Sequence, residues 1–268
     1  MTKNQVHIVS VGTSILSNFR RDNTRAAEYL PSTRQEKDEL LKYVKENPYR
    51  ASAELNSLRE FLEKGSVKKI YLIKTDTDEC DLTSSTIVSY LAEKGVKVEG
   101  KTISGYYPKS GKRNWSAEAA EAKFIEDLTN LLNTLLDFIR HNKEEDIYLN
   151  ATGGFKPEVT ILTLAGSLTK RPVYYRHEYF QRVVYLPPIP VIKPNENLQH
   201  LLKNLKSSEG GRLTKSQLGK MDPIAIKDAE AYGLIEKKLD EFEIVREIKL
   251  TGMGKLLADA FLRANEWD

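Results

Sequence analysis

The chain contains a single cysteine, Cys80, among its 268 residues. One thiol excludes an intrachain disulfide framework and a metal site built from several thiolates, and it favours a reducing compartment such as the cytoplasm. No apolar run approaches the roughly 18 residues that are needed to span a bilayer, and Met1 to Gln5 leads directly into a predicted strand. We therefore expect a cytoplasmic protein without a signal peptide or a membrane segment.

Two frequent nucleotide-binding signatures are also missing. No GxGxxG follows the first predicted strand, and no GxxxxGKS/T occurs anywhere. Their absence disfavours a dinucleotide-dependent dehydrogenase and a P-loop NTPase. The net charge of +3 is compatible with a phosphate-bearing ligand but is too small to indicate a nucleic-acid coat.

What the sequence does contain is an alternation of strand-like and helix-like segments. Apolar runs typical of strands occupy residues 6–11, 69–73, 96–103 and 146–149, with helical periodicity between them. This pattern predicts an α/β fold with a Rossmann-like, mostly parallel sheet flanked by helices. Residues 172–175 and 182–186 predict two further strands. The clearest helix carries an apolar stripe that should pack on the sheet: Phe124, Leu128, Leu131, Leu132, Leu135 and Ile139.

Four prolines within residues 186–194 are incompatible with a helix or a central strand. We place a linker at residues 188–195, between a first domain of residues 1–187 and a second domain of residues 196–268. In the second domain the sequence predicts three helices, a β-wing and a closing helix, which is the order of a winged helix-turn-helix. The signals are residues 198–205, Thr214 with Gln217, Asp222 with Pro223, residues 242–250, and Thr251.

A winged helix suggests DNA binding, but the charge of one predicted helix argues against it. The second helix of the turn carries Asp222, Asp228 and Glu230 against one cation, Lys227. Such a face repels phosphates, whereas a DNA reader presents several cations or amides there. The charge pattern favours a dimerisation or ligand-covering role, with DNA binding the less favoured alternative.

The most informative segment is Asn150-Ala-Thr-Gly-Gly-Phe-Lys-Pro-Glu158. It joins a predicted strand to a predicted helix through Gly153 and Gly154, whose backbone amides can approach a ligand without a Cβ in the way. Pro157 suits the first turn of a helix, and Lys156 adds a mobile positive charge. A strand, a glycine turn and a helix N-terminus together predict an anion site, although packing alone also explains adjacent glycines.

A second glycine turn follows the first predicted strand. Gly12-Thr13-Ser14 comes directly after residues 6–11, and Asn18 lies one helical turn further on. Loops that follow different strands line up along one edge of a doubly wound sheet. We therefore expect Ser14 and Lys156 to converge, although they are far apart in the sequence.

The segments Val11-Gly-Thr-Ser-Ile-Leu-Ser-Asn18 and 150–158 resemble the paired signature of the CRISPR-associated Rossmann-fold (CARF) proteins. Arg50-Ala-Ser-Ala-Glu-Leu-Asn-Ser-Leu58 resembles the ring-nuclease branch, and the resemblance covers most of the chain. It implies binding of a cyclic oligoadenylate across a homodimer, usually the cyclic tetra-adenylate made by type III CRISPR complexes. Ring nucleases also cut this ring and so switch the antiviral signal off.

Carried onto this sequence, the resemblance implies Ser14 and Lys156 as catalytic residues, with Thr75 and Asp76 in a third ligand-facing position. It implies no metal or other cofactor, because a ribose 2′-hydroxyl of the ring attacks the adjacent phosphate. The products would be linear di-adenylates with 2′,3′-cyclic phosphate ends. The implied ligand-binding loops contain Gly12, Thr13, Asn18, Asn150, Thr152, Gly153, Gly154 and Phe155.

Residues 104–115 match no motif of that family. This loop combines rings that could stack on adenine with cations that attract phosphate, so it could cover a bound ring or simply be solvated. The residues concerned are Tyr106, Tyr107, Lys109, Lys112 and Arg113.

Two other patterns have simpler explanations. Arg171 and His177 have the spacing of the helical ribonuclease domains attached to many CARF proteins, but they lie in a predicted β-rich stretch. A cluster of carboxylates indicates a helix start or a solvated turn rather than a metal site: Asp76, Asp78, Glu79 and Asp81.

Two alternatives to a ring nuclease stay open. One is a non-catalytic CARF sensor that binds the ring and regulates transcription through the winged helix. The other is an α/β domain whose glycine turns serve packing alone.

Overall fold

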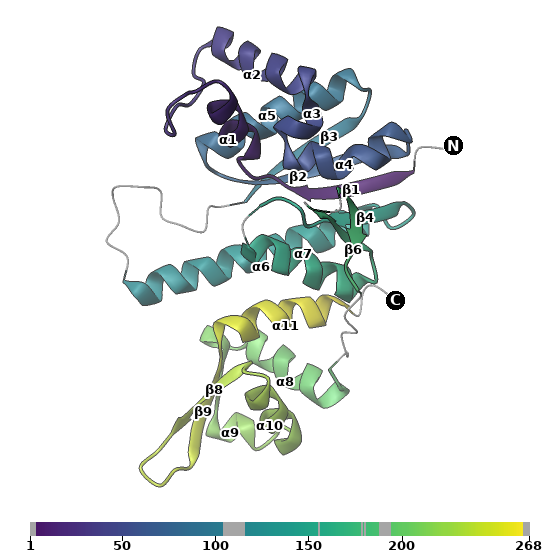
Figure 1. Cartoon of the computed structure of the whole chain (residues 1–268). Helices are drawn as coiled ribbons and strands as arrows, with labels where there is room; N and C mark the ends of the chain where they lie inside the picture. The colour runs from purple at the N-terminus through teal and green to yellow at the C-terminus, as the bar shows by residue number, and fades with distance from the viewer. Residues whose placement is uncertain are drawn as a thin grey trace. The chain divides into compact units, whose positions relative to one another are not determined.

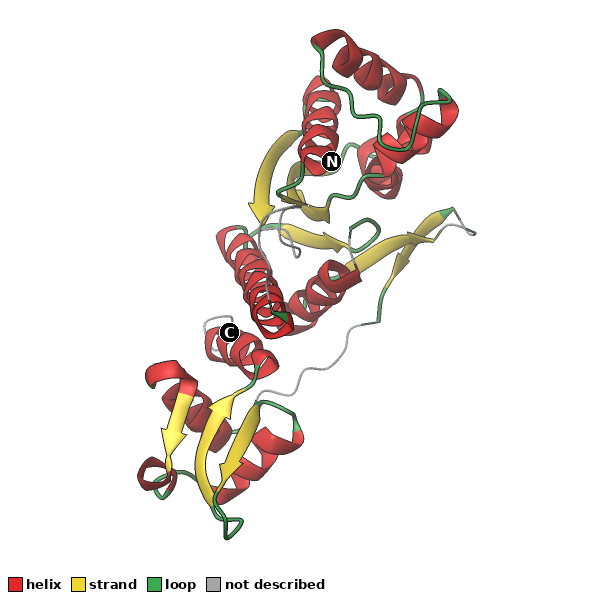
Figure 2. Cartoon of the chain, turned by 90° about the vertical axis from the view of Figure 1, so that its left-hand side faces the viewer, coloured by secondary structure: helices red, strands yellow, loops and turns green. Residues whose placement is uncertain are grey.

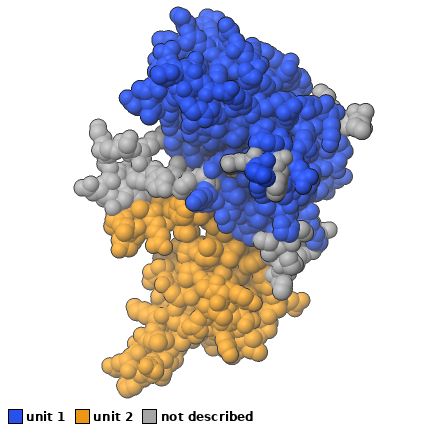
Figure 3. Space-filling view, viewed as in Figure 1, with its two compact units in different colours: residues 1–109, 134–189 blue, residues 110–133, 190–268 orange. Residues whose placement is uncertain are grey.

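The computed structural model describes residues 4–103, 116–154, 156–177, 179, 181–187 and 194–264. The chain divides into two compact units, which Figure 3 shows in different colours. The first unit comprises residues 1–109 and 134–189, and the second comprises residues 110–133 and 190–268. Residues 110–133 thus group with the second unit, whereas the sequence analysis assigned them to the first domain.

A six-stranded sheet forms the centre of the first unit, in the order β3-β2-β1-β4-β5-β6. The first five strands are parallel, and β6 pairs antiparallel with β5. The predicted α/β architecture is therefore confirmed. The strands are β1 (Gln5–Ser10), β2 (Val67–Thr75), β3 (Lys97–Ile103), β4 (Asp146–Asn150), β5 (Val173–His177) and β6 (Arg182–Tyr185).

Helices cover both faces of this sheet, with α1–α5 on one face and α6 and α7 on the other (Figure 1). Parallel strands covered in this way are buried on both sides, which is why Val6, Ile8 and Val9 of β1 are all almost fully buried. The helices are α1 (Ser14–Asp22), α2 (Arg34–Glu46), α3 (Pro48–Ala51), α4 (Ala53–Glu63), α5 (Asp78–Glu93), α6 (Ala117–His141) and α7 (Lys156–Thr169).

The order of the strands reverses at β1. From β1 the chain passes through α1–α4 to β2 on one side, and from β3 it returns through α6 to β4 on the other side. The connections that follow β1 and β4 therefore leave toward opposite faces of the sheet. In open α/β sheets the crevice at such a reversal point is the usual ligand site.

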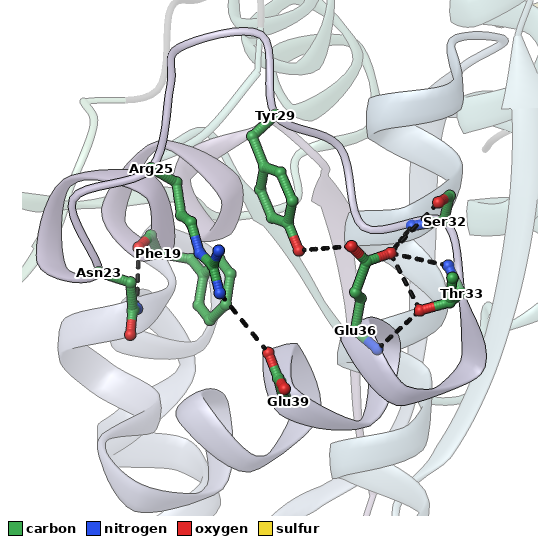
Figure 4. A network of polar contacts seen from close by, with 8 residues as sticks. All are labelled: Phe19, Asn23, Arg25, Tyr29, Ser32, Thr33, Glu36 and Glu39. Carbon is green, nitrogen blue, oxygen red and sulfur yellow. Dashed lines mark hydrogen bonds and ion pairs between the residues drawn. The ribbon is translucent and has the colours of Figure 1, made fainter.

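The connection between α1 and α2 is held by local polar contacts (Figure 4). Thr33 and Glu36 form a capping box at the start of α2, and Glu36 also accepts hydrogen bonds from the Tyr29 hydroxyl at 3.1 Å and the Ser32 amide at 2.9 Å. Hydrogen bonds from the backbone amides of Thr33 and Ser32, and from the hydroxyls of Thr33 and Tyr29, lower the pKa of Glu36 to about 2. The Nη2 atom of Arg25 lies 4.0 Å from Oε2 of Glu39 in α2, and this ion pair links the loop to the helix that follows it.

A buried histidine lies on β1 among aromatic rings. His7 has no exposed surface, and its Nδ1 lies 2.9 Å from the hydroxyl oxygen of Tyr174. Its ring centroid is 4.6 Å from that of Phe61 and 5.2 Å from that of Tyr148. Burial lowers the pKa of His7 to about 3, so the imidazole stays neutral in the folded protein at neutral pH.

Acidification is expected to destabilise the protein through His7. The unfolded chain takes up a proton near the ordinary histidine pKa of 6.5, whereas the folded chain does so only near 3. Stability is therefore full above pH 6.5 and falls by about 1.4 kcal/mol for each pH unit below it. We expect urea unfolding of wild type and His7→Gln to show a steeper loss in wild type between pH 6.5 and 5. Equal slopes in the two proteins would contradict this origin.

The described residues from 194 to 264, in the second unit, form a three-stranded antiparallel sheet in the order β7-β9-β8, together with helices α8 to α11 and a 3-10 turn at Glu209–Gly211 (Figure 2). The predicted helices and the closing helix are present, while the winged helix-turn-helix itself stays a prediction. They are α8 (Glu196–Ser207), β7 (Arg212–Thr214), α9 (Lys215–Leu218), α10 (Pro223–Ala231), β8 (Ile235–Leu239), β9 (Val245–Leu250) and α11 (Gly252–Ala264).

Helices α9, α10 and α11 begin at the residues that the sequence signals predicted. The hairpin, in contrast, differs from the wing predicted at residues 242–250. Thr251 accepts a hydrogen bond from the Gly254 amide and so caps α11. The hairpin has strands β8 and β9 on either side of a turn, so Phe242 lies in the turn rather than at the start of a strand. The cause is Asp240, whose Oδ1 accepts hydrogen bonds from the amides of Phe242 and Ile244.

In the part of the chain that the structure describes, no helix is both long enough and apolar enough to cross a membrane.

Candidate functional site

The two glycine turns predicted from the sequence lie against each other at the point where the strand order reverses. β1 and β4 are paired along their length, with Val9 opposite Asn150. A Cβ added to Gly12 would lie 3.4 Å from the backbone nitrogen of Gly154. The two turns therefore meet at the carboxyl edge of the sheet, which is the reversal-point crevice described above.

The turn after β4 presents backbone amides. Gly154 has a φ of +97° and is exposed, and the carbonyl of Gly153 accepts a hydrogen bond of 2.5 Å from the Ser10 hydroxyl. Among the described residues, the amides of Gly153 and Gly154 donate to no acceptor. Two such amides just ahead of the N-terminus of α7 form a suitable cradle for an anion.

Lys156 is the first residue of α7 and is exposed. Its ammonium group forms no ion pair or hydrogen bond with any residue that the structure describes. A cation at this end of a helix faces the positive end of the helix dipole, which is unfavourable unless an anion is also present. The position of Lys156 therefore fits a site whose ligand brings negative charge.

Ser14 is half-buried and begins α1 at the turn after β1. Its hydroxyl donates a hydrogen bond of 2.9 Å to Oε2 of Glu54 and accepts one of 3.1 Å from the amide of Ala53. The helix start has no side-chain cap within the described residues, since Thr13 makes no cap hydrogen bond. The Ser14 hydroxyl is therefore held in one orientation, beside a helix N-terminus that can attract negative charge.

Glu54 is the central polar residue that the sequence analysis did not identify. Its side chain has no exposed surface, and it accepts hydrogen bonds from the Gly12 amide at 2.8 Å, the Ser14 hydroxyl at 2.9 Å and the Ser52 hydroxyl at 2.7 Å. A Cβ on Gly153 would lie only 2.8 Å from Oε1 of Glu54. One carboxylate therefore holds the first glycine turn against the start of α4, and the second turn approaches the same carboxylate closely at Gly153.

This arrangement changes the role expected of Gly12. The sequence analysis assigned Gly12 to a ligand-binding loop, but its amide donates to Glu54. Because Gly12 has no Cβ, the two turns can approach each other closely at this position. A signal for Glu54 was present in the sequence, because it occupies the apolar face of α4 that also carries Leu55, Leu58 and Phe61. An acidic residue on such a face requires buried partners.

Asn150 and Thr152 stabilise the second turn through hydrogen bonds within the protein. Asn150 is 1 % exposed; its Nδ2 donates to the Ser57 hydroxyl at 2.6 Å and its Oδ1 accepts from the Thr152 amide at 3.0 Å. The Thr152 hydroxyl accepts a hydrogen bond from the Arg176 amide. The Asn150 amide is therefore used within the protein, and this residue fixes the turn rather than facing a ligand. Phe155 lies outside the described residues.

Thr13 of the first turn and Asn18 of α1 also make contacts within the protein. The carbonyl of Thr13 accepts from the Ser17 amide at 3.1 Å, which starts α1. The Nδ2 of Asn18 donates to the carbonyls of Arg50 and Ala51 at 3.1 and 3.0 Å. Asn18 thereby holds α3 in place just before the segment that carries Glu54.

Thr75 is the last residue of β2, the strand next to β1, and Asp76 follows it, so both reach the same edge of the sheet. The Thr75 hydroxyl donates to the sulfur of Cys80 at 3.2 Å. The neighbouring carboxylates form the first turn of α5, which Thr77 caps, so the interpretation as a helix start is confirmed. No group of three or more His, Cys, Asp or Glu residues within the described ranges could hold a metal ion.

His177 is the last residue of β5, so the pair with Arg171 does not lie on a helix, in agreement with the sequence analysis. Tyr106, Tyr107, Lys109, Lys112 and Arg113 lie in residues 104–115, outside the described part of the chain.

A sequence model of the family described as CRISPR-associated protein (Cas_APE2256) matches residues 49–189, more than half of the chain. The chain belongs to the Cas_APE2256 family. The match agrees with the resemblance to CRISPR-associated proteins found in the sequence. It includes Glu54, the second glycine turn and Lys156, whereas Ser14 precedes the matched residues.

Two solved structures are similar to this Cas_APE2256 member. Protein VC1899 from Vibrio cholerae has a TM-score of 0.42 at 9% identity, covering 97% of this chain and 66% of that chain. Can2 from Sulfobacillus thermosulfidooxidans, in complex with cyclic tetra-adenylate, has a TM-score of 0.40 at 10% identity, covering 98% of this chain and 64% of that chain. This chain thus spans about two thirds of the length of each. At TM-scores below 0.5 neither likeness establishes a function for this protein.

Proposed function

We propose that this Cas_APE2256 member is a ring nuclease that binds cyclic tetra-adenylate across a homodimer and cleaves it without a metal ion. The observation that carries the proposal is the meeting of the Gly12 and Gly154 turns at the reversal point of the sheet. At these turns and at the helix starts that follow them lie an oriented serine hydroxyl and, as far as the described residues go, two backbone amides and a lysine without partners. That combination suits a phosphodiester, and the family match supports a CRISPR role.

The proposed reaction needs little chemistry from the protein, because RNA supplies its own nucleophile. The 2′-oxygen of one ribose bonds to the adjacent phosphorus, and the bond from phosphorus to the 5′-oxygen breaks. The 2′-hydroxyl loses a proton to water and the 5′-oxygen gains one, leaving a 2′,3′-cyclic phosphate and a 5′-hydroxyl. Ser14 would orient the 2′-hydroxyl, while Lys156 and the glycine amides would stabilise charge on the phosphorane.

Turnover should be slow. Neither glycine motif contains a histidine, and general acid–base help is worth roughly 10²- to 10⁴-fold in rate. A slow enzyme fits the removal of a scarce signal. A two-fold dimer would present two Ser14 and two Lys156 side chains to a ring of matching symmetry, so two opposite phosphates could be cut to give linear di-adenylates.

The direct test is to incubate the purified protein with labelled cyclic tetra-adenylate in the presence of EDTA. We expect loss of the ring at the same rate with and without the chelator, and products that carry 2′,3′-cyclic phosphate. An EDTA-sensitive reaction would contradict the metal-independent mechanism. Tight binding without cleavage would instead support the alternative, a CARF sensor that regulates transcription through the second unit.

The charges of α10 weigh against that alternative. Asp222 caps this helix, and Glu230 is paired with Lys237 of β8. With Asp228, three carboxylates thus stand at or on this helix against one cation of its own, Lys227. A phosphate backbone would be repelled there, so we favour a dimerisation or ligand-covering role for the second unit.

A further inference from the structure

Glu54 determines the direction of the Ser14 hydrogen bond. A serine hydroxyl has one proton to donate and two lone pairs that can accept. The proton of Ser14 is donated to Oε2 of Glu54, and one lone pair accepts from the Ala53 amide. The hydroxyl of Ser14 therefore has one lone pair left and no proton to give.

We propose that Glu54 is a positioning residue that makes Ser14 a hydrogen-bond acceptor for a ribose 2′-hydroxyl. This inference rests on the proposed function. Ser14, half-buried at the crevice, would accept the 2′-hydroxyl proton in a hydrogen bond and leave the 2′-oxygen lone pairs directed at the phosphorus. Glu54 is fully buried beneath the turns and acts through Ser14 without touching the ring.

The hydrogen bonds that Glu54 accepts explain how this acidic residue can lie beneath a site proposed for phosphate. Its two carboxylate oxygens accept hydrogen bonds from the Gly12 amide and from the hydroxyls of Ser14 and Ser52, three donors on two separate segments of the chain. Hydrogen bonds to a charged acceptor are strong, and they spread its negative charge over the donors. Among the residues that the structure describes, the amides of Gly153 and Gly154 and the ammonium group of Lys156 have no partner, so they remain available for the ligand.

A selective ligand preference follows. A ring whose attacking riboses carry 2′-fluorine in place of the hydroxyl has nearly the same shape but no proton to donate. Wild-type protein should bind the hydroxyl ring about fivefold more tightly than the fluoro ring, the value of roughly one hydrogen bond. Ser14→Ala should bind the two rings equally, because the acceptor is gone.

Glu54→Gln tests the direction of the hydrogen bond with little change in shape. If the glutamine oxygen accepts from the Gly12 amide, its NH₂ group faces Ser14 and Ser52 and cannot accept from them. The Ser14 hydroxyl must then accept from this NH₂ group and from Ala53, and its own proton turns outward. The reverse orientation of the glutamine would place its NH₂ group against the Gly12 N–H, with two donors facing each other.

We expect Glu54→Gln to bind the hydroxyl ring about fivefold more weakly than wild type, to lose the preference over the fluoro ring, and to cleave the ring about ten- to a hundredfold more slowly in single-turnover assays. The double variant Glu54→Gln with Ser14→Ala should cleave no more slowly than Ser14→Ala alone, because Glu54 acts through Ser14. A double variant much slower than Ser14→Ala would overturn the proposal. So would a Glu54→Gln variant with wild-type rate and preference.

Ser52→Ala is the matched control. It removes another hydrogen bond to the same carboxylate and also removes the cap of α4, since the Leu55 amide donates to the Ser52 hydroxyl. It leaves the bond from Ser14 to Glu54 in place. We expect a lower melting temperature but a cleavage rate within about threefold of wild type. A rate as low as that of Glu54→Gln would show that general destabilisation causes both effects, which overturns the proposal.

The outcomes separate this inference from the proposed function. If wild type does not bind the hydroxyl ring, the proposed function fails and the role of Glu54 fails with it. If wild type cleaves the hydroxyl ring but binds the hydroxyl and fluoro rings with equal affinity, only the role of Glu54 fails. Should Glu54→Gln not fold, the comparison of wild type with Ser14→Ala still decides, because retention of the preference in Ser14→Ala would overturn the proposal.

Discussion

Lys156→Ala is expected to slow the cleavage of cyclic tetra-adenylate by a hundredfold or more in single-turnover assays, while the affinity for the ring falls by less than tenfold. Lys156 begins α7 beside the free amides of the glycine turn and has no partner among the described residues. In the proposed reaction charge grows on the phosphorus oxygens, so the lysine would stabilise the transition state more than the bound ring. Ser14→Ala should show a similar loss of rate.

Lys64→Ala provides the matched control for the loss of one positive charge. Lys64 is an exposed residue at the end of α4. Its removal lowers the net charge equally, and we expect cleavage within about twofold of wild type. A Lys156→Ala variant that loses affinity and rate by the same factor would show that the lysine only attracts the ring. One that keeps its rate would remove Lys156 from the mechanism.

Gly154→Ala is expected to destroy the binding site. The φ of +97° is a conformation that L side chains rarely adopt, and a Cβ there would lie 2.9 Å from the Cβ of Ser10 and 2.8 Å from its hydroxyl oxygen. Together the strain and the overpacking should cost about 2–4 kcal/mol of stability. If the turn moves instead, it separates from Gly12, and we expect ring affinity to fall by more than tenfold in a titration.

Gly95→Ala distinguishes backbone strain from the clash. Gly95 follows α5 with a φ of +68°, and a Cβ there would meet nothing within 4 Å. The variant should lose about 1 kcal/mol in urea unfolding and bind the ring as wild type does. Equal losses of affinity in the two variants would indicate a general effect of glycine replacement rather than a requirement of the turn.

The strands and the glycine turns were predictable from the sequence because their signals are local. Apolar runs bounded by polar turns located all six strands of the sheet within a few residues. The Pro157 and Thr251 signals marked the starts of α7 and α11. The meeting of the two turns followed from a general rule about parallel sheets and needed no knowledge of the side chains.

The partners of individual polar side chains were not predictable in this way. Glu54 resembles any acidic residue of an amphipathic helix until the turn at Gly12 and Ser14 is folded against it. Asn150 was assigned to the ligand, but it ends a strand with its side chain toward the hydroxyl of Ser57, 93 residues earlier in the chain. Which side of a turn a side chain occupies depends on contacts that are distant in sequence.

The pairing of β1 with β4 brings together residues about 140 positions apart. Closing so long a stretch of chain is slow, because the entropy of loop closure is lost before any contact is gained. During synthesis β1 must therefore wait until residue 150 has left the ribosome before its second side is covered. A nascent chain that stops short of that length would expose an apolar strand edge and would carry only one of the two turns, so it would be prone to association and would lack half of the proposed site.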